Sequence, residues 1–102
     1  MPSSPTSPRN QFGLALRAVR KARGLSQETF GLQSSRTYVS TLERGLKSPT
    51  LNKIDELAEV MGVHPITLMM CAYADLDKAN EVATLLQAVA AELNSILEPD
   101  RG

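Results

Sequence analysis

Apolar residues recur at the spacing of an α-helix along most of this chain, and no stretch sustains the period-two alternation of a β-strand. The first such segment covers residues 10–23, and Gly24 follows it as a stop signal. Its inner face is predicted to carry Phe12, Ala15, Leu16 and Val19. The pattern therefore predicts an all-α protein that begins with an amphipathic helix.

Two short helical patterns lie close together in residues 26–45, which read SQETFGLQSSRTYVSTLERG. Ser26 is a favourable N-cap for the first helix, and Phe30 is its first large apolar residue. Gln27 and Glu28 would lie in its first turn, where a carboxylate stabilises the positive end of the helix dipole. This region thus predicts a pair of short helices joined by a brief connection.

The second helix of this pair is expected to present a polar outer face. Its N-cap is Ser34 or Ser35, and it should run to about Glu43, with Gly45 ending it. Its apolar side holds only Val39 and Leu42. Its outer side holds hydrogen-bonding residues, namely Arg36, Thr37, Ser40 and Thr41, with Tyr38 at the edge. A short helix with such a surface suits insertion into the major groove of DNA.

Two further helices are predicted before residue 75. The first covers residues 51–61, between an N-cap at Thr50 and a stop at Gly62. Its inner stripe is predicted to be Leu51, Ile54, Leu57, Ala58 and Met61. The second covers residues 65–73, with His64 as N-cap and Pro65 in its first turn. Because this second helix is apolar nearly all round, it must be buried on several sides, which implies a partner.

A last, long helix is predicted to run from a cap at Asp75 or Asp77 to about Leu97. Apolar residues repeat along it at intervals of four and three, which is typical of a coiled coil, at Val82, Leu86, Val89, Leu93 and Ile96. Leu85, Ala90 and Leu97 widen this stripe beyond the needs of one neighbour. We interpret the helix as a homodimerisation element; the alternative is that it packs only on its own domain.

The formal net charge is zero, but the charges are divided between two halves of the chain. Up to Lys53 there are nine basic residues against two acidic ones, and from Ile54 onward there are two basic residues against nine acidic ones. A basic N-terminal half favours contact with a polyanion such as DNA. The acidic half is suited to a position away from phosphates, or to contact with another protein.

The ordered set of motifs resembles the Xre/Cro-like, phage-repressor type of helix-turn-helix family over about residues 12–68. It consists of Arg20, GLSQE at 24–28, YVSTLERG at 38–45, SPTL at 48–51 and LAEVMGVHP at 57–65. The chain departs from the family in one place. It is two residues shorter between Gln27 and Tyr38, where the turn lies, and Gly31 stands where the family prefers Ala. This departure bears on the angle of the recognition helix, residues 35–43.

The resemblance implies a role for each polar residue of this region. Base reading falls to Arg36, Thr37, Ser40 and Thr41, and Arg36 suits a bidentate contact to guanine. Phosphate contacts fall to Gln27, Tyr38, Arg44, Lys47 and Ser48. The family also pairs Arg20 with Glu43, which predicts a structural ion pair.

The predicted organisation is a disordered arm at 1–10, a DNA-binding domain at 11–74, the dimerisation helix at 75–98 and a tail at 99–102. No nucleophile has a plausible histidine partner, so we expect no enzyme activity. One His and one Cys (Cys71, expected to be a buried, inert thiol) predict neither a metal site nor a cofactor. No apolar run approaches 18 residues, and we expect a cytoplasmic protein without a membrane anchor.

Three functions remain open at this point. The first is a homodimeric repressor that binds a palindromic operator in double-stranded DNA. The second is an antitoxin or accessory regulator whose acidic C-terminal half binds a partner protein. The third is a protein-interaction module that has the fold without binding DNA.

Overall fold

The computed structural model describes residues 11–31, 35–75 and 77–98. The predicted arm at 1–10, the tail at 99–102 and the alternative cap Ser34 lie outside these residues. The elements, in chain order, are α1 (Phe12–Ala22), the 3₁₀ turn η1 (Gln27–Phe30), α2 (Arg36–Glu43), α3 (Leu51–Met61), α4 (Pro65–Tyr73) and α5 (Ala79–Leu97). The described residues contain no strand, so the all-α prediction is confirmed.

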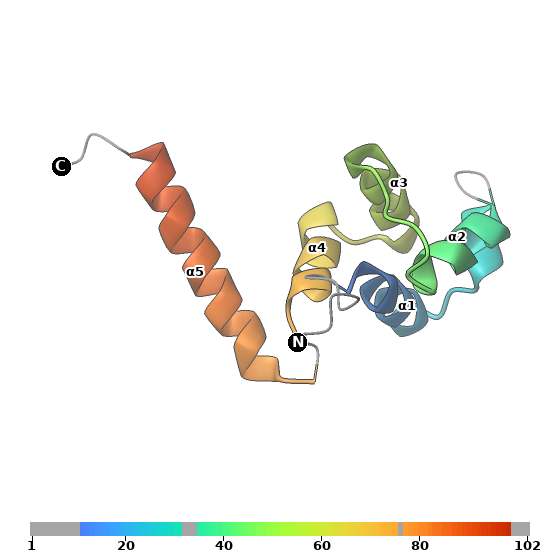
Figure 1. The fold of residues 1–102 in the computed structure, drawn as a ribbon, viewed down its shortest axis with the longest axis horizontal. Helices are drawn as coiled ribbons and strands as arrows, with labels where there is room; N and C mark the ends of the chain where they lie inside the picture. Colours follow the sequence, from blue (N-terminus) through green and yellow to red (C-terminus); the bar gives the residue numbers. More distant parts are fainter. Residues whose placement is uncertain (1–10, 32–34, 76, 99–102) are drawn as a thin grey trace.

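One apolar core holds the first four α-helices and η1 together. Helix α1 packs against both α2 and α4, and α3 packs against α4 and η1 (Figure 1). The largest fully buried side chains are Phe30, Leu16, Leu42, Leu57, Leu68 and Val39. The predicted inner faces of α1 and α2 are therefore the buried faces, and α2 exposes its opposite side.

Local capping signals fix where three of the helices begin. The hydroxyl of Ser35 accepts a hydrogen bond from the backbone N–H of Tyr38 at 3.0 Å, and this starts α2. Thr50 caps α3 in the same way, and Nδ1 of His64 accepts from the N–H of Ile66 at 2.9 Å to start α4. A side chain that accepts such a bond satisfies one of the donors left free at a helix start. These predicted caps are confirmed.

The segment after Ser26 differs from its prediction, because it forms a single four-residue 3₁₀ turn and no α-helix. The hydroxyl of Ser26 caps nothing and lies 3.3 Å from the hydroxyl of Thr29. Backbone bonds of the i to i+3 type close the turn, including that from Gly31 N–H to the carbonyl of Glu28. A 3₁₀ turn is the usual form for so short a helical piece.

Two other sequence predictions about helix faces and ends are wrong. Leu51 is 74% exposed because it is the first residue of α3 and points away from the core, so the buried stripe begins at Ile54. Neither Asp75 nor Asp77 caps α5, which begins at Ala79 without a side-chain cap. The Asp75 carboxylate instead accepts from the backbone N–H of Asp77 at 2.9 Å, which forms a turn before the helix.

Helix α5 stands apart from the core (Figure 1). None of its 19 residues is buried. Within its apolar stripe, Leu86 and Leu93 are each 50% exposed and Ile96 is 68% exposed. The predicted division at residue 75 and the dimer role of α5 stay predictions, since the structure describes one chain.

Candidate DNA-binding interface

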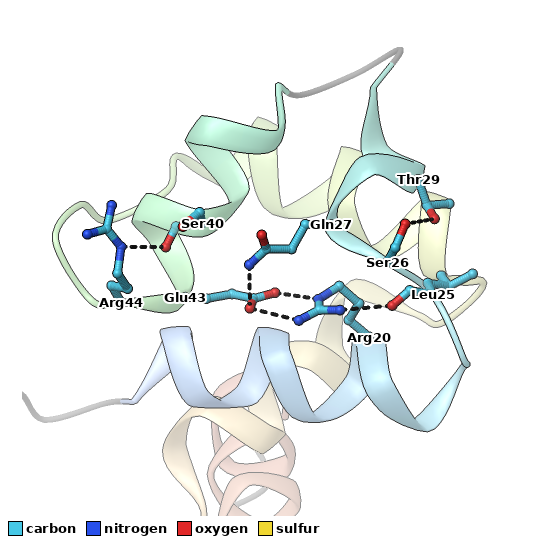
Figure 2. Close-up of polar contacts among 8 residues, drawn as sticks. All are labelled: Arg20, Leu25, Ser26, Gln27, Thr29, Ser40, Glu43 and Arg44. Carbon is cyan, nitrogen blue, oxygen red and sulfur yellow. Dashed lines mark hydrogen bonds and ion pairs between the residues drawn. The ribbon is translucent and has the colours of Figure 1, made fainter.

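Helix α2 is anchored at its C-terminal end by an ion pair with α1. Nε and Nη2 of Arg20 donate to the two carboxylate oxygens of Glu43 at 2.6 and 3.0 Å (Figure 2). A third donor, Nη1, reaches the backbone carbonyl of Leu25 at 2.9 Å. The side chains of Arg20 and Glu43 are only 11% and 5% exposed. The geometry is the bidentate one that gives such pairs both strength and direction, so it orients α2 on α1.

The same carboxylate also holds η1. Nε2 of Gln27 donates to Oε1 of Glu43 at 3.0 Å, so side chains from α1, η1 and α2 meet at one buried group (Figure 2). Burial by itself would raise the pKa of Glu43, but the hydrogen bonds from Arg20 and Gln27 outweigh it and lower that pKa. The hydrogen bond to Glu43 likewise raises the pKa of Arg20. Both groups are therefore charged at neutral pH.

Gly13 allows α1 to lie directly against the end of α2, and the sequence analysis did not identify this contact. A Cβ atom at residue 13 would lie 2.5 Å from the carbonyl oxygen of Leu42 and 2.7 Å from that of Glu43. Both are backbone atoms, which cannot move aside as a flexible side chain can. A glycine at the second residue of an otherwise amphipathic helix was the available signal.

The outer face of α2 is the candidate reading surface. Arg36 and Thr37 are exposed, and Ser40 and Thr41 are half-buried on the same helix. The hydroxyl of Thr41 donates to the carbonyl of Thr37 at 2.8 Å, which leaves its methyl group and an oxygen lone pair for an outside partner. Arg36 lies 3.8 Å from the exposed carboxylate of Glu28 on η1. All four predicted base-reading residues thus lie on one short helix.

Several predicted phosphate-contacting residues gather beside this helix. Arg44, Lys47 and Ser48 are exposed and line a 300 Å³ hollow whose other wall is the N-cap Gln11 and the first three residues of α1. Nε of Arg44 donates weakly to the carbonyl of Ser40 at 3.4 Å (Figure 2). Exposed cations next to a helix N-terminus make a surface that favours anions.

The two remaining phosphate-contact predictions fall on residues with partners inside the fold. The amide nitrogen of Gln27 already donates to Glu43. Tyr38 is half-buried, and the ammonium group of Lys53 lies 5.4 Å from the centre of its ring. Their roles at DNA stay predictions, and the structure shows that both also connect parts of the domain.

The structure also bears on the other chemistry considered from the sequence. No cluster of metal-ligating side chains occurs in residues 11–31, 35–75 and 77–98. Among the helices described, none is long and apolar enough to cross a membrane. Cys71 is half-buried, and this burial raises the pKa of its thiol.

Comparisons with known proteins agree with this geometry. A helix-turn-helix family model matches residues 16–68. An uncharacterized HTH-type transcriptional regulator, y4dJ, from Sinorhizobium fredii is 36% identical over 63 residues, which are 60% of this chain and 82% of that protein.

Two solved structures are similar. The restriction-modification controller protein C.AhdI from Aeromonas hydrophila is 41% identical with a TM-score of 0.54, over 56% of this chain and 86% of that one. The clp gene regulator ClgR from Corynebacterium glutamicum is 26% identical with a TM-score of 0.59, over 91% of this chain and 93% of that one. The family match covers more than half of the sequence, and the chain belongs to the Xre/Cro-like family of helix-turn-helix transcriptional regulators.

Proposed function

We propose that this protein is a homodimeric repressor that reads a palindromic operator with α2 in the major groove. The observation that carries the proposal is the contrast between the two sides of α2. Its inner side is fixed by the Arg20–Glu43–Gln27 contacts. Its outer side presents Arg36 and Thr37 to solvent. A base-reading helix needs this combination, because a loosely held side chain cannot discriminate between base edges.

Affinity and specificity come from different residues in this proposal. Arg44, Lys47 and Ser48 contact phosphates and set the register of α2 in the groove. Arg36 donates to O6 and N7 of a guanine, while Thr37, Ser40 and Thr41 read neighbouring bases through hydroxyl or methyl contacts. To reach guanine, Arg36 leaves Glu28, an exposed ion pair that costs little to break. Gln27 and Tyr38 contact phosphates of the DNA backbone at the edge of the groove.

Two copies would place two such helices about 34 Å apart, one turn of DNA. The helix α5 is the proposed means of association, because none of its residues is buried and Leu86, Leu93 and Ile96 of its stripe are half or more exposed. Repression then follows from occupation of the operator.

Selection of bound DNA from a random pool, followed by footprinting, tests this function. The expected result is a two-fold symmetric consensus with half-sites one helical turn apart. An asymmetric consensus would remove the dimer from the proposal, and no enrichment would leave the protein-interaction function in its place. The salt dependence of affinity measured on the selected site gives the number of phosphates neutralised.

A second candidate function is control of the genes of a restriction-modification system. It is favoured by the 41% identity to the controller protein C.AhdI. The selected site distinguishes this function from a general repressor: it should lie upstream of this protein's own gene, with methyltransferase and endonuclease genes adjacent. Different neighbouring genes would exclude the controller function and leave DNA binding intact.

A further inference from the structure

The apolar stripe of α5 continues into a groove between α5 and α4. This groove has a volume of 270 Å³. Its walls are nearly all apolar and are formed by Ile66, Thr67, Met70, Cys71, Val82 and Leu86. Only the first half of α5 borders it, and the second half of the helix extends beyond α4 (Figure 1). A segment that covers both the groove and the stripe must therefore be long and apolar.

The order of residue shapes along the stripe restricts how two copies of α5 can pair. The intervals of four and three place leucine at heptad positions a, and β-branched residues at positions d. The a residues are Leu86 and Leu93, and the d residues are Val82, Val89 and Ile96. Parallel two-stranded coiled coils favour the reverse arrangement, with β-branched residues at a and leucine at d. The stripe is thus poorly suited to a parallel pair.

The same stripe is nearly symmetric about its middle residue, with leucines three residues before and four residues after Val89. Read from Val89 in either direction, it gives a leucine and then a β-branched residue. When two antiparallel copies cross at Val89, each Val82 faces an Ile96, and each Leu86 lies within one residue, about 1.5 Å along the axis, of a Leu93. Each contact between residues i and j is then repeated as j with i about the axis, as in an isologous two-fold interface.

We infer that a second copy of this chain occupies the groove, with the two α5 helices antiparallel about a two-fold axis at Val89. This inference rests on the homodimer of the proposed function and gives that dimer its orientation. In this arrangement the last turn of the partner's helix lies over Val82 and Leu86 at the mouth of the groove. A parallel pair would place that turn roughly 15–20 Å farther along the axis, at 1.5 Å per residue, and the groove would stay open.

The area that a stable dimer buries also requires α4. A standard protein–protein interface uses about 20–30 residues from each partner. The stripe of α5 is far smaller than that, so a pair of α5 helices alone would be a weak contact. The antiparallel arrangement adds the partly or largely exposed apolar residues of α4, which include Ile66 and Met70. It therefore accounts for a helix α4 that is apolar nearly all round.

The charges on α5 are compatible with this close self-association. Its only charged residues are Glu81, which lies away from the Leu86–Leu93 seam, and Glu92, which borders the seam. Crossing at Val89 places the two copies of Glu92 roughly 9 Å apart along the axis. No like charges are brought into contact.

Disulfide trapping distinguishes the two orientations. In the full chain with Cys71→Ala, Leu86→Cys and Leu93→Cys are prepared separately, and each is oxidised alone and after mixing. Antiparallel pairing predicts a cross-linked dimer in the mixture only. In Leu86→Cys alone, the two Cβ atoms at position 86 would lie roughly 9 Å apart, beyond the ~4 Å that a disulfide allows. Val89→Cys should cross-link with itself. Ala91→Cys, on the opposite side of the helix, is the control and should not cross-link.

Sedimentation of each variant before oxidation shows whether the dimer is retained. Cross-linking of Leu86→Cys alone, at the rate of the mixture, would overturn the antiparallel arrangement and leave the dimer of the proposed function intact. A chain that sediments as a monomer at all concentrations would overturn both. A dimer that cross-links as expected but enriches no DNA would leave the inference standing and remove the proposed function.

Discussion

Helices α2 and α5 are both amphipathic, but only the shorter helix, α2, buries its apolar side against the rest of its own chain. α2 has eight residues, and its inner side is enclosed by the core and by the Glu43 contacts with Arg20 and Gln27. α5 has 19 residues, and none of them is buried. Most helical stability in proteins comes from packing of an amphipathic face, and α5 packs little against its own chain. The comparison shows that α2 is covered within one chain, whereas α5 leaves most of its apolar stripe exposed, and the proposed dimer would cover it.

Removal of residues 76–102 should have the largest effect, and it should act on DNA affinity and not on the fold of α2. A chain that ends at Asp75 is expected to be a monomer that binds whole operators about 10²–10⁴-fold more weakly, because the second half-site contact is no longer intramolecular. Sedimentation and binding to whole and half sites measure both properties. Removal of residues 99–102 alone is the control. A truncated dimer with full affinity would place the dimer contact within α3 and α4.

Arg20→Ala should have the largest effect on stability, with a loss of about 3–5 kcal/mol in the free energy of unfolding. The substitution leaves the buried carboxylate of Glu43 with Gln27 as its side-chain donor among the described residues. Urea unfolding gives the change, and Lys21→Ala, on the exposed side of the same helix, should alter it little. Unchanged stability combined with lost DNA binding would instead make Arg20 a DNA contact.

Gly13→Ala should cost about 1–3 kcal/mol, the usual range for added volume in a packed site. The new methyl group would overlap the backbone carbonyls of Leu42 and Glu43. Thermal or urea unfolding measures the loss. Gly31→Ala is a matched control, because its Cβ would lie 3.3 Å from one carbonyl oxygen only. Equal losses at the two positions would mean that α1 does not approach α2 as closely as described.

Arg36→Ala should cost about 1–3 kcal/mol in affinity for the best operator, with relaxed preference at one base pair. The fold should be unaffected, since the Arg36 side chain is 68% exposed. Affinities for a panel of single-base variants test this. Lys47→Ala is the comparison, because loss of a phosphate contact weakens all sites about equally and lowers the salt dependence. A uniform loss for Arg36→Ala would reassign it to a phosphate.

Glu43→Gln should change how stability depends on pH, and this change in pH dependence is the smallest of the five expected effects. The folded-state pKa of Glu43 is lowered, so the unfolded chain takes up the proton first and folding is weakened as the pH falls. The wild-type advantage over Glu43→Gln should be constant above about pH 5 and decline below the usual glutamate pKa of about 4.3. Urea unfolding from neutral pH down to about pH 3 measures it. A difference that does not vary with pH would mean that Glu43 is not an ionised partner of Arg20.

Residues that act locally were predictable from the sequence. Thr50 and His64 cap the helices that follow them because the bonded atoms lie two or three residues away. The 3₁₀ form of η1 was not predictable, because a cap signal at Ser26 and an apolar Phe30 are compatible with either an α-helix or a 3₁₀ turn. The Gly13 contact joins residues about 30 positions apart, and helical periodicity carries no information about such an approach.

The same distinction applies to the candidate site. The Arg20–Glu43 pair was expected from the family resemblance, and the structure confirms it. That Gln27 donates to the same carboxylate was not expected, since its position at a helix start suggested a phosphate contact. A side chain such as Gln27 can form a hydrogen bond either with DNA or with another part of the fold. Its partner can be assigned only when its neighbours in space are known. Helical spacing alone was enough to predict which residues of α2 lie on its outer side, and the structure has them on that side.

The uncovered stripe of α5 has a consequence for how this regulator would respond to its own abundance. In the proposed dimer, α5 is covered only after two chains meet, so the DNA-binding species forms according to the square of the monomer concentration when monomer predominates. Operator occupancy then rises more steeply than in proportion to the amount of protein made. A chain that buried α5 against its own domain would respond in proportion to its amount at low occupancy, whereas the proposed dimer would respond more steeply to the same change in protein concentration.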